Sequence, residues 1–163
     1  MPQSLHFARE GERDIVMTRT FPAPPERVFR ALTTPETIRR WALGPPGHRF
    51  VACENDPRPG GAIRYVWRQP DGSEIGLRGT YREVEAPHRL VHTERFDVDW
   101  TDGETTVTTR LDPVPEGTRL TTAIRYRSAA GRDGAAACMK DGIAMSYDRL
   151  ADLVAEPAGR ASC

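Results

Sequence analysis

His92 and Glu94 are the pair of residues in this sequence best suited to acid–base chemistry. They lie in the segment RLVHTERF at 89–96, where apolar and polar residues alternate as in a β-strand. Leu90 and Phe96 define the inward-facing parity of that strand, and the histidine and the glutamate share it. Side chains two residues apart on one face of a strand lie about 7 Å apart. Both can therefore reach one polar group of a ligand, directly or through water.

The inward parity of Glu94 raises the question of what compensates its charge. A buried carboxylate needs a partner, a bound proton or access to solvent, because burying an unpaired charge is costly. His92 can be that partner, and the pair could then abstract a proton, which is the chemistry of a cyclase. Alternatively, a bulge or the end of the sheet exposes both side chains to water. The sequence leaves both interpretations open.

Other catalytic and metal-binding motifs do not occur in the sequence. Lys140 is the only lysine and follows a methionine, so no GxxxxGK[ST] phosphate loop exists, and GxGxxG, HExxH and GxSxG are also absent. His88 lies four residues before His92, about 13 Å away along a strand. The two histidines and Glu94 therefore do not converge as metal ligands must. We expect neither a metal nor a cofactor.

Length and composition limit the class of protein. A chain of 163 residues suits one domain, and 38% hydrophobic residues with 23 acidic and 23 basic ones exclude a disordered chain. The charge balance also argues against a nucleic-acid partner, and no apolar run approaches the about 20 residues that a membrane-spanning helix needs. Three cysteines without disulfide or metal spacing, and an N-terminus without a signal-peptide pattern, favour the cytoplasm.

Arginine supplies nearly all of the positive charge. Of the 23 basic residues only Lys140 is a lysine, which leaves 22 arginines. We interpret this bias as codon usage in a GC-rich genome rather than as a set of anion clamps. Arginines such as Arg64 and Arg68 fall on the outward parity of their strand, and that face could be solvated or form a homodimer interface.

Hydrophobic periodicity predicts the order of the elements. A strand at 14–21 is followed by two short helices that begin at Pro25 and Pro35. Regular turn signals then separate six further strands, and apolar residues at helical spacing predict a long helix over 135–155. Because the long helix is the only element large enough to cover an antiparallel sheet, we predict an α+β fold in which a curved sheet grips one helix.

The domain limits follow from the same patterns. Residues 1–11 are polar and patternless and predict a flexible N-terminal arm. Residues 12–156 contain all of the predicted elements and form the single domain. Pro157 ends the last helix, so residues 157–163 are expected to form a C-terminal tail.

Five stretches of the sequence together cover nearly the whole chain. They are FPAPPERVFRALTTPETIRRW at 21–41, NDPRPGGAIRYVW at 55–67, GTYREVEAPHRLVHTERF at 79–96, TTVTTRLDPVPEGTRLT at 105–121 and MKDGIAMSYDRLADLV at 139–154. In this order they resemble the START-like (SRPBCC) superfamily of helix-grip proteins, and more narrowly the branch named after the activator of the heat-shock protein 90 ATPase. The closing helix departs from that pattern, since an aromatic residue is common in the family near Ile143 or Ala144.

The resemblance implies a cavity between the sheet and the long helix that holds a lipid-like or other hydrophobic molecule. Relatives include polyketide cyclases, antibiotic-resistance proteins and co-chaperones. No catalytic motif is common to all proteins with this fold. We therefore expect a pocket for a mostly apolar ligand rather than a filled core. The expected ligand-binding residues are Trp41, Tyr65, Trp67, Leu77, Tyr81, His92, Glu94, Phe96, Met139, Ile143 and Tyr147.

Three functions follow in order of preference. The first is binding of a small hydrophobic or amphipathic molecule, with His92 and Glu94 as the polar contact. The second is a cyclase- or hydrolase-like enzyme that acts on a polyketide-like substrate with one of these two residues as general base. The third is a module that modulates a chaperone ATPase, placed last because the eukaryotic co-chaperone has an additional domain that we do not expect in 163 residues.

Overall fold

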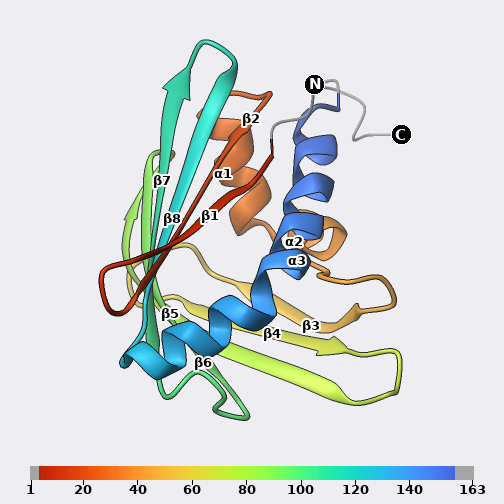
Figure 1. The fold of residues 1–163 in the computed structure, drawn as a ribbon. Helices are drawn as coiled ribbons and strands as arrows, with labels where there is room; N and C mark the ends of the chain where they lie inside the picture. The colour runs from red at the N-terminus through yellow and green to blue at the C-terminus, as the bar shows by residue number, and fades with distance from the viewer. Residues whose placement is uncertain (1–3, 157–163) are drawn as a thin grey trace.

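A curved antiparallel sheet wraps around a long helix in the computed structural model, which describes residues 4–156 (Figure 1). The eight strands form one sheet in the order β1-β2-β8-β7-β6-β5-β4-β3. The strands are β1 (His6–Glu10), β2 (Asp14–Phe21), β3 (Arg49–Asn55), β4 (Ala62–Arg68), β5 (Glu74–Glu85), β6 (Arg89–Phe96), β7 (Thr105–Val114) and β8 (Gly117–Arg125). The helices are α1 (Pro25–Thr33), α2 (Pro35–Trp41) and α3 (Ala129–Val154). The predicted α+β helix-grip architecture is confirmed.

The N-terminal segment differs from the sequence prediction. A loose arm over residues 1–11 is wrong for His6–Glu10, which form β1 and pair antiparallel with β2. Gly11, at φ +54°, supplies the left-handed residue in the tight connection between the two strands. The buried Arg132 of α3 donates hydrogen bonds to three carbonyls around this connection. As an edge strand, β1 is largely exposed and lacks the apolar alternation by which strands are recognised.

The long helix begins at Ala129 rather than at residue 135. Ser128 is its N-cap, and the Ser128 hydroxyl accepts a hydrogen bond from the backbone N–H of Gly131 at 3.0 Å. The first turns contain mainly alanine and glycine, which give no apolar periodicity to detect. The predicted tail over residues 157–163 lies outside the described residues. Within the described part of the chain, no helix is long and apolar enough to cross a membrane.

Three separate clusters of buried apolar residues hold the sheet and the helices together. One joins β2, α1, β7 and β8 to the second half of α3 around Leu120 and Leu150. Another packs the first half of α3 on β2, β7 and β8 around Ile15 and Ile124. The third, around Tyr81, lies on β4, β5 and β6 and has no buried member from α3. The long helix is therefore packed tightly on one half of the sheet only.

Strand pairing confirms which side chains face the helix. Tyr65 pairs with Leu77, which in turn pairs with Phe96, so these three side chains share the inner face of the sheet. On the outer face, both terminal nitrogens of Arg64 donate to the carboxylate of Asp97, at 2.7 and 2.8 Å. At least this part of the arginine-rich face is thus compensated within the chain.

Candidate functional site

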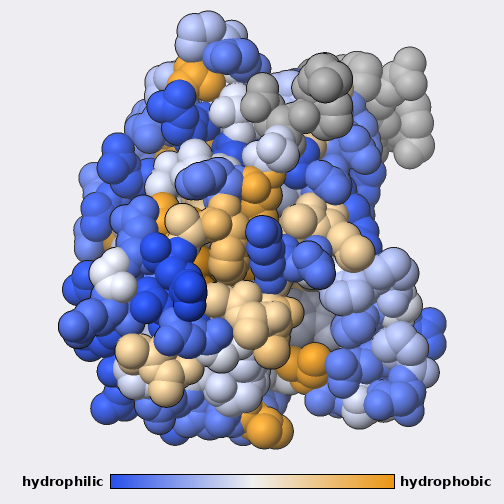
Figure 2. Space-filling view, in the orientation of Figure 1, coloured by the Kyte–Doolittle hydropathy of each residue, from blue (hydrophilic) through white to orange (hydrophobic). Residues whose placement is uncertain are grey.

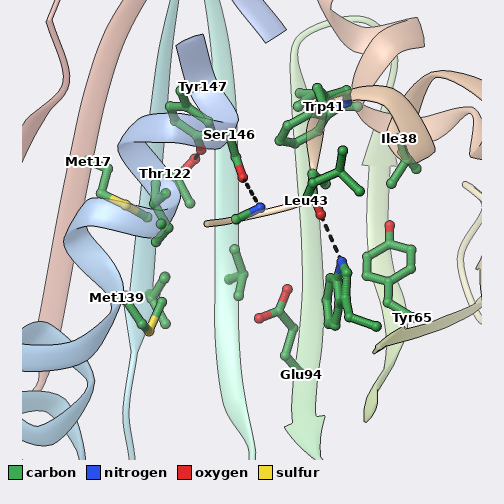
Figure 3. Close-up of a pocket in the computed structure, with 18 of the residues that line it drawn as sticks. Met17, Ile38, Trp41, Leu43, Tyr65, Glu94, Thr122, Met139, Ser146 and Tyr147 are labelled. Carbon is green, nitrogen blue, oxygen red and sulfur yellow. Dashed lines mark hydrogen bonds between the residues drawn. The ribbon is translucent and has the colours of Figure 1, made fainter. Parts of the chain in front are cut away.

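A cavity of about 490 Å³ lies between the sheet and α3, and members of all three apolar clusters line it. Its walls come from strands β2 to β8, the helices α1, α2 and α3, and the loop over residues 42–48 (Figure 3). Aromatic and aliphatic side chains form most of this lining. Figure 2 shows apolar residues gathered toward the middle of the face that α3 crosses, within a mostly hydrophilic surface.

Ten of the eleven predicted residues line this cavity, and one does not. Leu77 lies on the inner face of β5 but is only 4% exposed and contributes to the packed core instead. Its two cross-strand partners carry larger aromatic rings, and both of these rings line the cavity. The ten lining residues are Trp41, Tyr65, Trp67, Tyr81, His92, Glu94, Phe96, Met139, Ile143 and Tyr147.

The two tryptophans in the wall offer apolar surface only. The indole N–H of Trp41 donates to the carbonyl of Ala31 at 2.9 Å, and that of Trp67 donates to the carbonyl of Ala42 at 2.8 Å. This hydrogen bond fixes the orientation of each ring. It also uses the whole polar capacity of the indole, which has one donor and no acceptor. The ring faces are thereby left for contact with an apolar molecule.

His92 and Glu94 place polar atoms in this apolar cavity. Nε2 of the histidine lies 2.9 Å from Oε2 of the glutamate, and the two side chains are 13% and 26% exposed. The carboxylate projects into the cavity (Figure 3). Because a carboxylate can only accept, its hydrogen bond with the imidazole places the ring proton on Nε2. Nδ1 is then the ring nitrogen with a free lone pair. Within residues 4–156, this buried Nδ1 has no hydrogen-bond partner.

The sequence left two interpretations open for this pair, a buried pair in mutual contact and a pair at a bulge, and the structure shows one feature of each. The two side chains contact each other and line the cavity, as a buried pair requires. A β-bulge lies directly beside them, between Tyr81 and Glu83 on the neighbouring strand β5. Among the described residues, no group of three or more histidine, cysteine, aspartate or glutamate side chains is arranged to hold a metal.

Asn55 connects two tyrosines of the wall and was not found by sequence reasoning. The Tyr81 hydroxyl donates to the amide oxygen of Asn55 at 2.9 Å, and the amide nitrogen donates to the Tyr65 hydroxyl at 2.7 Å. The proton of the Tyr65 hydroxyl is not used in this chain of hydrogen bonds. Asn55 is the last residue of β3 and precedes a Pro/Gly-rich turn. Its sequence context is therefore that of an ordinary turn residue.

All four tyrosines of the chain remain protonated well above neutral pH. Burial is the first cause of the raised pKa in each case, and it raises the pKa of Tyr81 to about 12. The negative charge of Glu94 is a further cause that raises the pKa of every one of these phenols. The four are Tyr65, Tyr81, Tyr126 and Tyr147.

The loop over residues 42–48 closes one side of the cavity. The backbone N–H of Gly44 donates to the hydroxyl of Ser146 on α3 at 2.9 Å, which ties the loop to the helix (Figure 3). Gly44 has φ +67°, a conformation that favours glycine. The sequence signals a turn here but not its contact with the helix, because that contact depends on a residue 102 positions away.

Comparisons with known proteins identify the family and support the fold. The model of the family described as Activator of Hsp90 ATPase homolog 1-like protein matches residues 22–155. A solved structure from Rhodobacter sphaeroides is 35% identical, with a TM-score of 0.88 over 93% of this chain and 98% of that one. A Chromobacterium violaceum protein is 30% identical, with a TM-score of 0.75 over 88% of this chain and 99% of that one.

A Nitrosomonas europaea protein is 26% identical, with a TM-score of 0.79 over 91% of this chain and 97% of that one. No significant match occurs among curated protein sequences. The START-like resemblance carried by the five sequence stretches is confirmed. On this evidence the chain belongs to the family of Activator of Hsp90 ATPase homolog 1-like proteins.

Proposed function

We propose that this protein binds a small, mostly apolar molecule in the cavity between the sheet and α3. The observation that carries the proposal is the cavity of about 490 Å³ with a predominantly apolar wall. Cavities for small molecules commonly measure about 300–1,000 Å³ and combine such walls with a few polar groups. An apolar space left unfilled inside a protein lowers its stability. A ligand that fills the space recovers the lost contacts.

The ligand is expected to lie between the aromatic side chains of the sheet and the inner side of α3. Trp67 and Tyr81 offer ring surface from the sheet, and Met139 and Ile143 offer aliphatic surface from the helix. The polar contact is assigned to His92 and Glu94, the only ionisable pair that is hydrogen-bonded within the described wall. The two cysteines within residues 4–156, the buried Cys53 and the exposed Cys138, are free, which is consistent with a cytoplasmic location.

Native mass spectrometry of the protein purified from its own host tests this proposal. We expect a bound species that adds the mass of one small molecule and that is released on denaturation, after which it can be identified. The same spectrum reports whether the arginine-rich outer face joins two copies. A protein that is always empty, and that also fails to take up neutral apolar compounds added in solution, would contradict the proposal.

An enzymatic role is the second candidate, and the contact between His92 and Glu94 favours it. A histidine hydrogen-bonded to a carboxylate inside an apolar cavity is suited to abstract a proton, the step that begins a cyclisation. His92→Gln keeps the size and one hydrogen bond but cannot act as a base at neutral pH. We expect this change to abolish turnover of a polyketide-like substrate while binding is retained. If the wild-type protein turns over none of the compounds that it binds, the enzymatic role is refuted.

A further inference from the structure

The charges around the cavity are distributed very unevenly. The chain carries 23 basic residues, yet none of the arginines or the lysine within residues 4–156 lines the cavity. Two carboxylates do line it, the partly buried Glu94 of β6 and the exposed Asp141 in the middle of α3. An acidic and aromatic cavity inside an arginine-rich protein indicates that the cavity distinguishes between ligands of different charge.

The buried cations near the helix are already paired elsewhere. Arg19 lies beneath α3 with its guanidinium 2.6 Å from the carboxylate of Asp148 and 5.4 Å from the ring centre of Phe21. Arg132 binds Asp133 and three backbone carbonyls around the β1–β2 connection. Neither arginine lines the cavity. The described wall also contains two histidines, but His48 lies within hydrogen-bond distance of the carbonyl of Pro45 and His92 of the carboxylate of Glu94. An anionic ligand would therefore be desolvated without an arginine or lysine as its partner, which is unfavourable.

The carboxylate of Glu94 has room for one more partner. Its Oε2 contacts His92, and within residues 4–156 no other side chain hydrogen-bonds this carboxylate. Figure 3 shows it projecting into the cavity, on the side where aromatic rings from β4 line the wall. The faces of aromatic rings carry partial negative charge and attract cations. The carboxylate and the rings thus favour the same kind of ligand.

We propose that the ligand is a hydrophobic amine, bound as its ammonium ion with an N–H donated to Oε1 of Glu94 and its hydrocarbon part against the aromatic wall. This inference rests on the proposed binding function and adds the chemical class of the ligand to it. A fatty acid or another apolar anion is disfavoured by the same arrangement. A neutral alcohol can donate to Glu94 too, but it has no positive charge to pair with the carboxylate or to lie over the aromatic rings.

Three rigid compounds with one hydrocarbon skeleton test the inference: 1-aminoadamantane, 1-adamantanol and adamantane-1-carboxylate. Their affinities are measured at neutral pH by displacement of the neutral dye Nile red. We expect the amine to bind about tenfold more tightly than the alcohol, because only the ammonium ion adds an ion pair with Glu94 and attraction to the ring faces. The carboxylate should bind most weakly.

Glu94→Gln keeps the shape of the side chain and removes its charge. We expect it to abolish the preference for the amine over the alcohol, because the amine loses its ion pair whereas both compounds can still donate to the amide oxygen. Glu54→Gln is the matched control, since this exposed glutamate on β3 does not line the cavity. Equal binding of the three compounds, a preference for the carboxylate, or an amine preference that survives Glu94→Gln would overturn the inference but leave the binding function intact. If none of the compounds and no dye binds, both proposals fail.

Discussion

Glu94 carries the charge that most affects the interior of this protein. Its carboxylate lies among aromatic side chains, and its field contributes to the raised pKa of four phenols that come from β4, β5, α3 and the residue after β8. Within residues 4–156, the exposed Glu54, in contrast, contributes to the raised pKa of only two groups, Cys53 and Arg64, both of which are its close neighbours on β3 and β4. A neutral phenol is a hydrogen-bond donor, so the carboxylate of Glu94 helps to keep the tyrosines of the cavity in their donating form.

The tyrosines provide a direct test at this scale. We expect the folded protein to show no tyrosinate absorbance as the pH rises through about 10, the ordinary tyrosine pKa, whereas the protein in denaturant titrates there. Because folding raises each pKa, the unfolded state loses its protons first, and the free energy of unfolding declines as the pH rises above about 10. An ultraviolet pH titration measures this. Tyrosinate absorbance near pH 10 in a protein that is still folded would show that the burial described for Tyr65, Tyr81, Tyr126 and Tyr147 is wrong.

At the scale of elements, α3 holds the sheet through a few fully buried side chains. Leu150 is 0% exposed and belongs to the cluster that also contains Phe21, Val28 and Leu120. The first half of the helix packs through Ala135 and lines the cavity through Met139. One helix thus serves both as the anchor of the fold and as a wall of the site.

Leu150→Ala removes the centre of that anchor. We expect the free energy of unfolding to fall by about 2–5 kcal/mol, because the change loses buried apolar surface and leaves a cavity in a closely packed region. Urea denaturation followed by circular dichroism measures the loss. Met145→Ala on the same helix is the control, since Met145 is 40% exposed and its truncation should cost less than about 0.5 kcal/mol. Equal effects of the two changes would contradict the packing of α3.

Local patterns were enough to predict most of the elements but not all of their contacts. Alternation located β2 and the strands of the wall, and it placed Glu94 and His92 on the inner face. It missed β1, which has no apolar face, and the first turns of α3, which are small residues. Asn55 and Ser146 could not be found, because their roles depend on partners far away in the sequence. Leu77 was misplaced because parity gives a face, not a depth.

At the scale of the whole molecule, the helix packs closely on one half of the sheet and leaves the other half open. The third apolar cluster, on β4, β5 and β6, has no buried partner from α3, and the cavity lies in the intervening space. On α3, Ile143 lines this space with an aliphatic side chain that is smaller than an aromatic one. A smaller side chain at this position leaves more of the space to a ligand.

Filling the cavity from two opposite walls tests the central claim most directly. The double variant Ile143→Trp and Val107→Phe adds bulk from α3 and from β7, and Nile red titration with a melting curve compares it with the wild type. Met145→Trp, which enlarges a side chain of α3 outside the cavity, is the control. We predict that the wild type and the control bind one dye molecule, and that the double variant remains folded but binds at least about tenfold more weakly, as expected for lost ligand space. A wild type that binds no dye, or a folded double variant that binds it equally well, would contradict a ligand-binding cavity between the sheet and α3.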